Sequence, residues 1–564
     1  MNFKTMLCSS LTKVLPQVEP PALKRKICSV LKGETFSFQI ACLGKVNWFS
    51  HRVPVTVESE LKKYVHVRSV EQVPVDWFPN NLDQDIISDQ IGFYPDVLRE
   101  LEDGCYRGHR NIWNALWVDV KVPKNCKPGK YPVTITLSVP EIDPATDAEF
   151  IEIGRKDFSQ TLTLEVIDAV LPPQKLKNTH WFHSDCLMSH YGFEAFSPEY
   201  WKCVAAFMRT AASHGINMIL TPVFTPPLDT RVGGERPTVQ LVKVKCTKGK
   251  YSFDFSLLEK WITVAKKAGM KYFEMSHLFT QWGAGFTPKI MAVVNGKEKR
   301  IFGWDVKADS KEYIAFLDAF LPALVQFIDA NGLRDNVYFH CSDEPSLPHL
   351  ENYTKASNLL RKYLKDYRIF DALSKTDFYE KGLITIPVPC ENHLDAFMEF
   401  DVPERWTYYC CEPATECSNR FIYMPSSRNR IFGSLLYYYG VEGFLHWGFN
   451  FYYSCFSSFK VDPYVETSAH FSYPAGDGFL VYPGAGGKPE DSLRLEVFFH
   501  ALQDQRALDL LEQLIGREKV CKLLDQASPD GKMSMAHYPI GEKAVLDLRE
   551  KINALIKKNL SSSK

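Results

Sequence analysis

The sequence predicts three consecutive domains: an antiparallel β-sandwich over residues 1–170, a (β/α)8 TIM-type barrel over 171–460 and a C-terminal extension with amphipathic helices over 461–564. Three observations carry this prediction. Apolar and polar residues alternate up to about residue 170. Beyond that point, apolar strand-like runs alternate with stretches of helical period. A Gly/Pro-rich stretch and amphipathic helical patterns then end the chain, whose 564 residues suffice for several domains.

The first 170 residues contain short strands separated by Gly, Pro and Asn. Apolar and polar side chains alternate at 131–138 and at 161–166, and shorter stretches such as 116–122 repeat the pattern. Short alternating strands without helices between them favour an antiparallel sandwich. The segment 171–174 (LPPQ) then breaks the pattern and indicates a short, stiff linker.

Eight apolar runs follow this linker, and stretches of helical period lie between them. The runs lie at 178–186, 216–224, 271–279, 336–345, 367–374, 383–389, 406–412 and 443–450. Helix signals accompany them, including Ser197-Pro198 as N-cap and first-turn proline, with Gly215 as the stop. Eight strand–helix units predict a closed barrel. A doubly wound sheet is the alternative, because counting strands does not show closure.

Composition excludes several classes of protein. With 66 basic and 67 acidic side chains the net charge is −1, so we expect no nucleic-acid partner. We find no run of 18 apolar residues and therefore expect no membrane span. The first 20 residues lack the apolar core of a signal peptide, which predicts a cytoplasmic location. The 15 cysteines are scattered and include no C-x-x-C, which indicates reduced, mostly buried thiols.

Known cofactor and nucleophile motifs are missing from the sequence. It has no G-x-x-x-x-G-K-[ST], no G-x-G-x-x-G after a strand, no H-E-x-x-H and no G-x-S-x-G. We therefore expect no cofactor and no resident metal.

Polar and aromatic side chains gather instead at the carboxyl ends of the predicted strands, where a barrel builds its active site. The candidates are His183, Asp185, His277, Trp282, Asp343, Glu344, Tyr408, Tyr409, Trp447 and Asn450. Aromatic rings can stack on the C–H faces of a sugar, and carboxylates and amides can bond its hydroxyls. This mixture therefore predicts a carbohydrate substrate.

Asp343-Glu344-Pro345 is the most informative segment. Two adjacent carboxyl groups in a partly dry barrel mouth repel each other, so at least one pKa should be raised. A carboxylic acid that stays protonated near neutral pH is the general acid that glycoside cleavage needs. Pro345 favours an extended Glu344. The alternative is an acidic pair that decorates a loop or caps the next helix.

Adjacent carboxyl groups suit one particular mechanism. Most glycosidases place two carboxyl groups ~5 to 9 Å apart across the scissile bond, which sequence neighbours cannot easily span. Neighbours fit substrate assistance, in which the 2-acetamido carbonyl of the sugar attacks its own anomeric carbon. Glu344 would then be the general acid and base. Asp343 would hold the amide N–H and stabilise the oxazolinium.

The remaining candidates have narrower predicted roles. Tyr408 and Tyr409 alternate along a strand, so one of them should face the site and could bond the acetamido oxygen. Trp447 could form the wall against the acetamido methyl group, with core packing as the alternative. His183, Asp185 and His277 could bind a metal, although strand-end residues of this kind more often bond hydroxyls or each other.

The chain resembles glycoside hydrolase family 123 and related uncharacterised bacterial proteins. The resemblance rests on HSDC (183–186), SHLFTQWG (276–283), SDEP (342–345), GFLHWGFN (443–450) and GDGFLVYPG (476–484). It implies an N-terminal β-sandwich, a (β/α)8 barrel and β-N-acetylgalactosaminidase activity. It also implies retaining, substrate-assisted chemistry by Asp343 and Glu344 without a metal.

The resulting functional hypothesis is removal of a terminal β-linked N-acetylgalactosamine from an oligosaccharide or glycoconjugate. Three alternatives remain at this point. The chain could be a β-N-acetylglucosaminidase or another glycosidase on the same scaffold, a non-catalytic carbohydrate-binding protein, or a structural protein acting through its N-terminal sandwich. The sequence does not determine linkage, aglycone, galacto or gluco preference, or oligomeric state.

Overall fold

The computed structural model describes residues 3–44, 52–143 and 151–562. The chain folds into two compact units made of interleaved segments. The sheet unit comprises residues 1–174, 418–439 and 490–564, and the barrel unit comprises 175–417 and 440–489. The three linear domains expected from the sequence differ from this division, because parts of the chain after residue 417 return to the sheet unit.

The sheet unit contains two β-sheets. One has the order β1-β3-β8-β5-β6 with Asp491 and Ser492 of β24 beside β6, and its neighbours are antiparallel. The other has the order β2-β10-β9-β4-β7 and includes one parallel pair, β2 with β10. The strands span β1 (Phe3–Ser9), β2 (Ile27–Lys32), β3 (Thr35–Gly44), β4 (Val53–Glu58), β5 (Val65–Val75), β6 (Gly92–Glu100), β7 (Cys105–Tyr106), β8 (Trp113–Lys121), β9 (Gly129–Ile142), β10 (Glu152–Val170) and β24 (Lys488–Ser492).

Both sheets contribute to one hydrophobic core. Its buried members alternate along the strands, as Val133, Ile135 and Leu137 do on β9, and they include the thiols of Cys28 and Cys42. The N-terminal region is therefore β-rich, as the alternation predicts. The precise sandwich arrangement stays a prediction, and the parallel β2–β10 pair departs from a purely antiparallel one.

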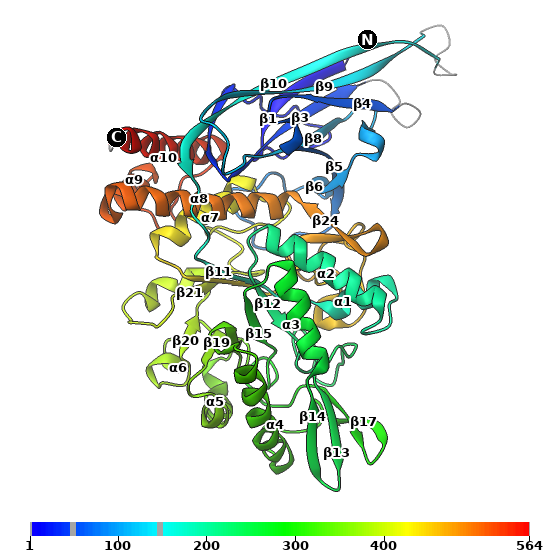
Figure 1. The fold of residues 1–564 in the computed structure, drawn as a ribbon, viewed down its shortest axis with the longest axis vertical. Coiled ribbons are helices and arrows are strands. Elements are labelled where there is room, and N and C mark those ends of the chain that lie inside the picture. The colour runs from blue at the N-terminus through cyan, green and yellow to red at the C-terminus, as the bar shows by residue number, and fades with distance from the viewer. Residues whose placement is uncertain (1–2, 45–51, 144–150, 563–564) are drawn as a thin grey trace. The chain divides into compact units, whose positions relative to one another are not determined.

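Helices from later in the chain complete the sheet unit. They are α7 (Ser426–Tyr438), α8 (Leu493–Ile515), α9 (Arg517–Ala527) and α10 (Glu542–Ser562), and α7 and α8 lie side by side (Figure 1). A Cβ on Gly433 would clash with the carbonyl oxygen of Ala501. Only glycine therefore permits this close approach of α7 to α8. The three C-terminal helices agree with the two or three predicted after about residue 491.

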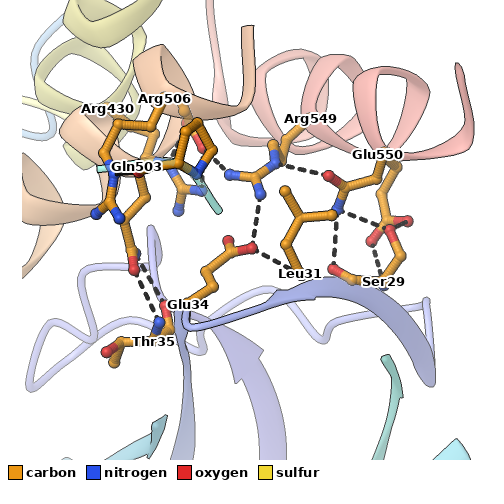
Figure 2. Close-up of polar contacts among 12 residues, drawn as sticks. Ser29, Leu31, Glu34, Thr35, Arg430, Gln503, Arg506, Arg549 and Glu550 are labelled. Atoms are coloured by element: carbon orange, nitrogen blue, oxygen red, sulfur yellow. Dashed lines mark hydrogen bonds and ion pairs between the residues drawn. The ribbon is translucent and has the colours of Figure 1, made fainter. Parts of the chain in front are cut away.

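Buried ion pairs join α7, α8 and α10 to one another and to the loop between β2 and β3 (Figure 2). Arg549 of α10 donates to Glu34 at 2.7 Å and to Asp504 of α8 at 2.6 Å. Arg430 of α7 binds Asp504 through two hydrogen bonds. Burial raises the pKa of Asp504, but the two guanidinium groups outweigh it and hold that pKa below its usual range. The network therefore depends on every charge being paired.

The barrel unit is built around eight parallel strands. Their order in the sheet is β20-β19-β18-β15-β12-β11-β22-β21. They span β11 (Lys177–His180), β12 (Met218–Thr221), β15 (Tyr272–Met275), β18 (Val337–Phe339), β19 (Arg368–Ala372), β20 (Ile386–Val388), β21 (Trp406–Tyr408) and β22 (Gly443–His446). Each strand overlaps one of the eight predicted apolar runs. Strand existence is thus confirmed for all eight.

Hydrogen bonds between the end strands of this sheet nearly close it into a barrel. The backbone N–H of Tyr408 on β21 donates to the carbonyl of Pro389, directly after β20, at 3.0 Å. Cys390 and Tyr408 form a parallel β-bridge beside this bond. A doubly wound sheet keeps two free edges, so this pairing favours the TIM-like barrel over that alternative.

Helices cover the barrel strands (Figure 1). They are α1 (Ser184–Tyr191), α2 (Pro198–Ser213), α3 (Ser256–Ala268), α4 (Lys311–Ala330), α5 (Leu350–Leu364) and α6 (Asp377–Glu380). Ser197 caps α2 by accepting from the N–H of Tyr200, as predicted. Within the described residues, α4 is the one helix whose length and apolar composition would suffice to cross a membrane. Its Phe320 packs against Phe224, so α4 has the contacts of a core helix.

Smaller strands lie in the loops of the barrel unit. They form a four-stranded sheet of order β14-β13-β16-β17, from β13 (Lys243–Thr247), β14 (Lys250–Asp254), β16 (Ile290–Val294) and β17 (Lys297–Phe302). Strand β23 (Val481–Gly484) follows the Gly/Pro-rich stretch.

We expect Arg549→Ala to destabilise the sheet unit by about 3–5 kcal/mol, because Glu34 would stay buried without its cation. Urea unfolding measures this loss. The matched control is Arg155→Ala, whose partner Glu152 lies in a half-exposed pair, and it should cost less than about 1 kcal/mol. Equal losses of unfolding free energy in the two variants would show that Arg549 does not compensate the buried charge of Glu34.

Candidate active site

The carboxyl ends of the barrel strands surround a cavity of about 170 Å³. Six of the ten predicted site residues line it: His183, Trp282, Asp343, Glu344, Tyr408 and Trp447. They come from the ends of five strands, β11, β15, β18, β21 and β22. Barrel topology thus brings together side chains that lie up to 264 positions apart, as the hydrogen bond from His183 to Trp447 shows.

Asp343 and Glu344 lie on a tight turn after β18. The N–H of Glu344 donates to the carbonyl of Ala372 at the end of β19, at 3.0 Å, and the N–H of Trp282 donates to the carbonyl of Asp343 at 2.8 Å. Glu344 has φ +43°, in the left-handed region that residues with a Cβ seldom adopt. The extended Glu344 expected from Pro345 is therefore wrong, because these backbone bonds outweigh the preference before proline.

Such backbone strain clusters at functional sites when the surrounding structure holds it in place. Here the turn presents both carboxyl groups to the cavity. The hydroxyl of Tyr408 donates to Oε1 of Glu344 at 2.6 Å and so orients its carboxyl group.

The charge of Asp343 is strongly disfavoured. Burial and the adjacent Glu344 raise the pKa of Asp343 well above its usual range, with smaller contributions from Asp371 and Glu274. The positive charge of His340 opposes this shift. The structure therefore agrees with the prediction that at least one pKa of the pair is raised, and the raised pKa is that of Asp343, the residue predicted to hold the acetamido group.

His340 lies between two buried carboxylates. Its Nδ1 is 2.9 Å from Asp371 and its Nε2 is 2.5 Å from Glu274. Burial disfavours its charge, but these hydrogen bonds outweigh burial and raise the pKa of His340 to about 9. His277 stacks on His340 with ring centroids 3.9 Å apart. Burial and that neighbouring charge hold the pKa of His277 well below its usual range, so His277 is neutral.

A second buried cluster fixes the wall around His183. Arg236 binds Asp185 through two 2.8 Å hydrogen bonds and donates to Nδ1 of His183 at 3.0 Å. Nε2 of His183 is therefore the protonated nitrogen and donates to the carbonyl of Trp447 at 2.9 Å. Because Arg236 already binds both side chains, His183 and Asp185 are poorly suited to hold a metal cation as well.

Four predicted residues lie behind the cavity wall. Asp185 binds Arg236, and His277 stacks on His340. Asn450 accepts from the N–H of His183 and donates to its carbonyl, which clamps that residue. Tyr409 packs against Phe444, whereas Tyr408 faces the cavity, as strand alternation requires of one member of the pair.

Trp447 forms one wall of the cavity. Its Nε1 donates to Asp477 at 2.8 Å, and its ring contacts Phe451 and Tyr473 edge-on. An aromatic ring that its own hydrogen bond holds in place is a rigid, apolar surface.

Comparison with known proteins identifies the family. A model of the glycoside hydrolase 123 catalytic domain matches residues 181–511. This chain belongs to glycoside hydrolase family 123. Family membership makes it a glycosidase of the hydrolase class, and it confirms the resemblance inferred from the strand-end motifs. No protein of curated function matches the chain.

One solved structure shares the fold of this family 123 chain over its whole length. It is a family 123 glycoside hydrolase from Clostridium perfringens with 16% identity, 100% of this chain and 98% of that chain covered, and a TM-score of 0.71. Two others match weakly. A β-glucuronidase 2 mutant of Bacteroides uniformis has 9% identity over 86% and 49% of the two chains, with a TM-score of 0.28. A family 5 mannosidase of Rhizomucor miehei has 13% identity over 59% and 93%, with a TM-score of 0.30.

Sequence reasoning missed several cavity residues of this family 123 chain, Asp229 and Tyr473 above all. The hydroxyl of Tyr473 donates to Oδ1 of Asp229 at 2.6 Å, and both side chains line the cavity. Oδ2 of Asp229 is buried without a hydrogen-bond partner among the described residues. Burial raises the pKa of Asp229. The available signal was weak, because Asp229 lies in a loop eight residues beyond the end of β12.

We expect Glu344→Gly to be more stable than Glu344→Ala by about 1 kcal/mol, because glycine adopts φ +43° without strain and alanine does not. Urea unfolding of the two variants measures the difference. Both variants lose the same carboxyl group, so each serves as the control for the other. An alanine variant of equal or greater stability would show that the turn is unstrained.

Proposed function

We propose that this family 123 protein is a retaining β-N-acetylgalactosaminidase that uses the 2-acetamido group of its substrate as the nucleophile. In this proposal Glu344 protonates the leaving oxygen and later activates water. Asp343 holds the acetamido N–H and stabilises the positive oxazolinium. The observation that carries the proposal is the position of two adjacent carboxyl groups on one turn of an aromatic-walled cavity.

Adjacency supports substrate assistance because two carboxyl groups on one turn approach the sugar from the same side. A retaining enzyme with its own nucleophile needs carboxyl groups ~5 Å apart on either side of the bond. Asp343 and Glu344 on one turn do not form such a pair, so we propose that the 2-acetamido group of the substrate is the nucleophile.

The electrostatics of Asp343 support its proposed role. Burial and Glu344 raise the pKa of Asp343. A carboxylate that is costly to ionise gains most when a positive charge develops beside it in a dry site. In the proposed reaction the oxazolinium supplies that positive charge beside Asp343.

Other cavity residues complete the proposed site. Trp447 would contact the acetamido methyl group through its fixed ring. Tyr408 would orient Glu344 through the existing hydrogen bond. Trp282, whose side chain is 43% exposed at the rim, would stack against the aglycone. The Clostridium perfringens relative hydrolyses glycolipid glycans, and we extend a glycoconjugate substrate with a terminal 2-acetamido sugar to this chain.

Nitrophenol release from a panel of nitrophenyl β-glycosides tests the proposal. We expect turnover of the N-acetylgalactosaminide, less of the N-acetylglucosaminide, and none of the plain galactoside or glucoside. Asp343→Asn should lower kcat about a hundredfold or more, because the oxazolinium loses its counter-charge. Glu344→Gln should lower the turnover of nitrophenyl glycosides less than that of substrates with poorer leaving groups, since nitrophenol leaves with little protonation.

Two outcomes of this panel would overturn parts of the proposal. Hydrolysis of a galactoside without the acetamido group would exclude substrate assistance. Turnover that Asp343→Asn leaves intact would exclude the assigned role of Asp343. Binding of N-acetylgalactosamine in calorimetry without hydrolysis of any glycoside would indicate a carbohydrate-binding protein.

Asp229 is the residue we propose to bind a sugar hydroxyl, through the Oδ2 that has no hydrogen-bond partner among the described residues. Asp229→Ala should lower kcat/KM about tenfold to a hundredfold, mainly through KM, since a hydrogen bond to a charged group contributes about 1.5–3 kcal/mol. The matched control is Tyr473→Phe, which removes one partner of Asp229 but keeps its carboxyl group. Initial rates over a range of substrate concentrations measure both. An Asp229→Ala effect confined to kcat would contradict a binding role.

A further inference from the structure

One carboxylate, Asp371 at the end of β19, accepts hydrogen bonds from the backbone directly before the Asp343–Glu344 turn. Its Oδ1 accepts the N–H of Cys341 at 3.1 Å, and its Oδ2 accepts the N–H of Ser342 at 3.2 Å. The hydroxyl of Tyr353 on α5 donates to Oδ2 at 2.6 Å. Asp371 is fully buried. It therefore fixes the two residues that lead directly into the carboxyl pair.

The same carboxylate also holds His340, the residue that begins this turn. His340 is hydrogen-bonded on both sides, to Asp371 and to Glu274, and all three side chains are buried. Glu274 in turn accepts from the hydroxyl of Thr179 at 2.5 Å and from Nε1 of Trp181 at 2.6 Å. Trp181 lines the cavity. The network thus reaches from the turn to the opposite wall.

We propose that Asp371 is a positioning residue for the Asp343–Glu344 pair, acting through the backbone of residues 341–342 and through a His340 cation held between Asp371 and Glu274. This inference rests on the proposed function of that pair. The three residues of this network, Glu274, His340 and Asp371, are not among the ten candidates predicted from the sequence.

Two physical requirements of the turn support this assignment. A residue with a Cβ at φ +43° persists only where surrounding bonds over-determine the backbone, and Asp371 supplies bonds to both residues that precede Asp343. A buried cation next to a carboxyl pair also limits their mutual repulsion. The charged and titratable groups around His340 are Glu274 on β15, Asp371 on β19, His277 after β15, and Asp343 and Cys341 on its own segment.

Asp371→Asn tests the proposal, because asparagine keeps the shape but replaces one accepting oxygen with a donor and removes the charge. We expect kcat to fall about ten- to a hundredfold while KM changes little, since the substrate-binding walls remain. Loss of the Asp371 charge should lower the pKa of His340, which is about 9 with Asp371 in place, so we expect the kcat of the variant to decline at a lower pH on the alkaline side than that of the wild type. The matched control is Asp318→Asn, a carboxylate on α4 that also accepts a tyrosine hydroxyl, and it should leave both quantities unchanged.

Hydrogen exchange read by mass spectrometry supplies a measurement that needs no activity. In Asp371→Asn, the amides of residues 341–342 should exchange about tenfold faster or more, while those of α4 keep their wild-type rates. Nitrogen-15 histidine spectra should show His340 charged at pH 8 in the wild type and neutral in the variant.

The outcomes separate this proposal from the proposed function. Unchanged exchange at 341–342, or an unchanged charge on His340, would overturn the positioning role whatever the enzyme hydrolyses. A wild type that hydrolyses only glycosides without an acetamido group would overturn the proposed substrate, and the kcat and pH comparison would then be made on that glycoside. A loss of kcat without a change in its alkaline pH dependence would show that Asp371 does not act through the His340 cation.

Discussion

The closure between β20 and β21 is the constraint on which the candidate site depends. The N–H of Tyr408 and the hydroxyl of Thr407 both donate to the carbonyl of Pro389. These bonds place β21 next to β20, and the rest of the sheet then fixes the distance from Tyr408 across to the turn after β18. The 2.6 Å bond from Tyr408 to Glu344 is a consequence of this closure. In an open sheet β20 and β21 would be opposite edges, and Tyr408 would lie far from the carboxyl pair.

The buried carboxyl groups of the chain are compensated in two different ways. Asp185 and Asp504 are neutralised by guanidinium groups, which makes them structural. Asp343 instead lies beside a second carboxyl group, and the nearest compensation is a histidine already held by two other carboxylates. The charge of Asp343 is therefore only partly compensated, and a positive charge that develops in the cavity would interact with it strongly. The near-zero net charge of the whole chain conceals this local imbalance.

The sequence predicted the barrel strands and the carboxyl pair because both leave local signals. Apolar runs mark strands, and strand ends mark the active face of a barrel. The sequence does not show whether a side chain at a strand end lines the cavity or lies behind its wall. Asp185, His277 and Asn450 therefore appeared equivalent to the residues that line the cavity. Asp229 and Tyr473 come from long loops, whose path no periodicity describes. The strained Glu344 was missed because the preference before Pro345 is local, whereas the bonds that override it come from β19 and the loop after β15.

The interleaved division of the chain has a consequence for its biosynthesis. The barrel unit lacks β22 until residue 446 has been made, and the sheet unit lacks the partner of Glu34 until residue 549 has been made. Chains that fold during translation usually complete the N-terminal domain first. Here the N-terminal sheets must remain unfinished, with part of their surface uncovered, while the whole barrel is synthesised. Strands β2, β6 and β10 therefore lack their contacts with α8 and α10 until the last part of the chain has been made.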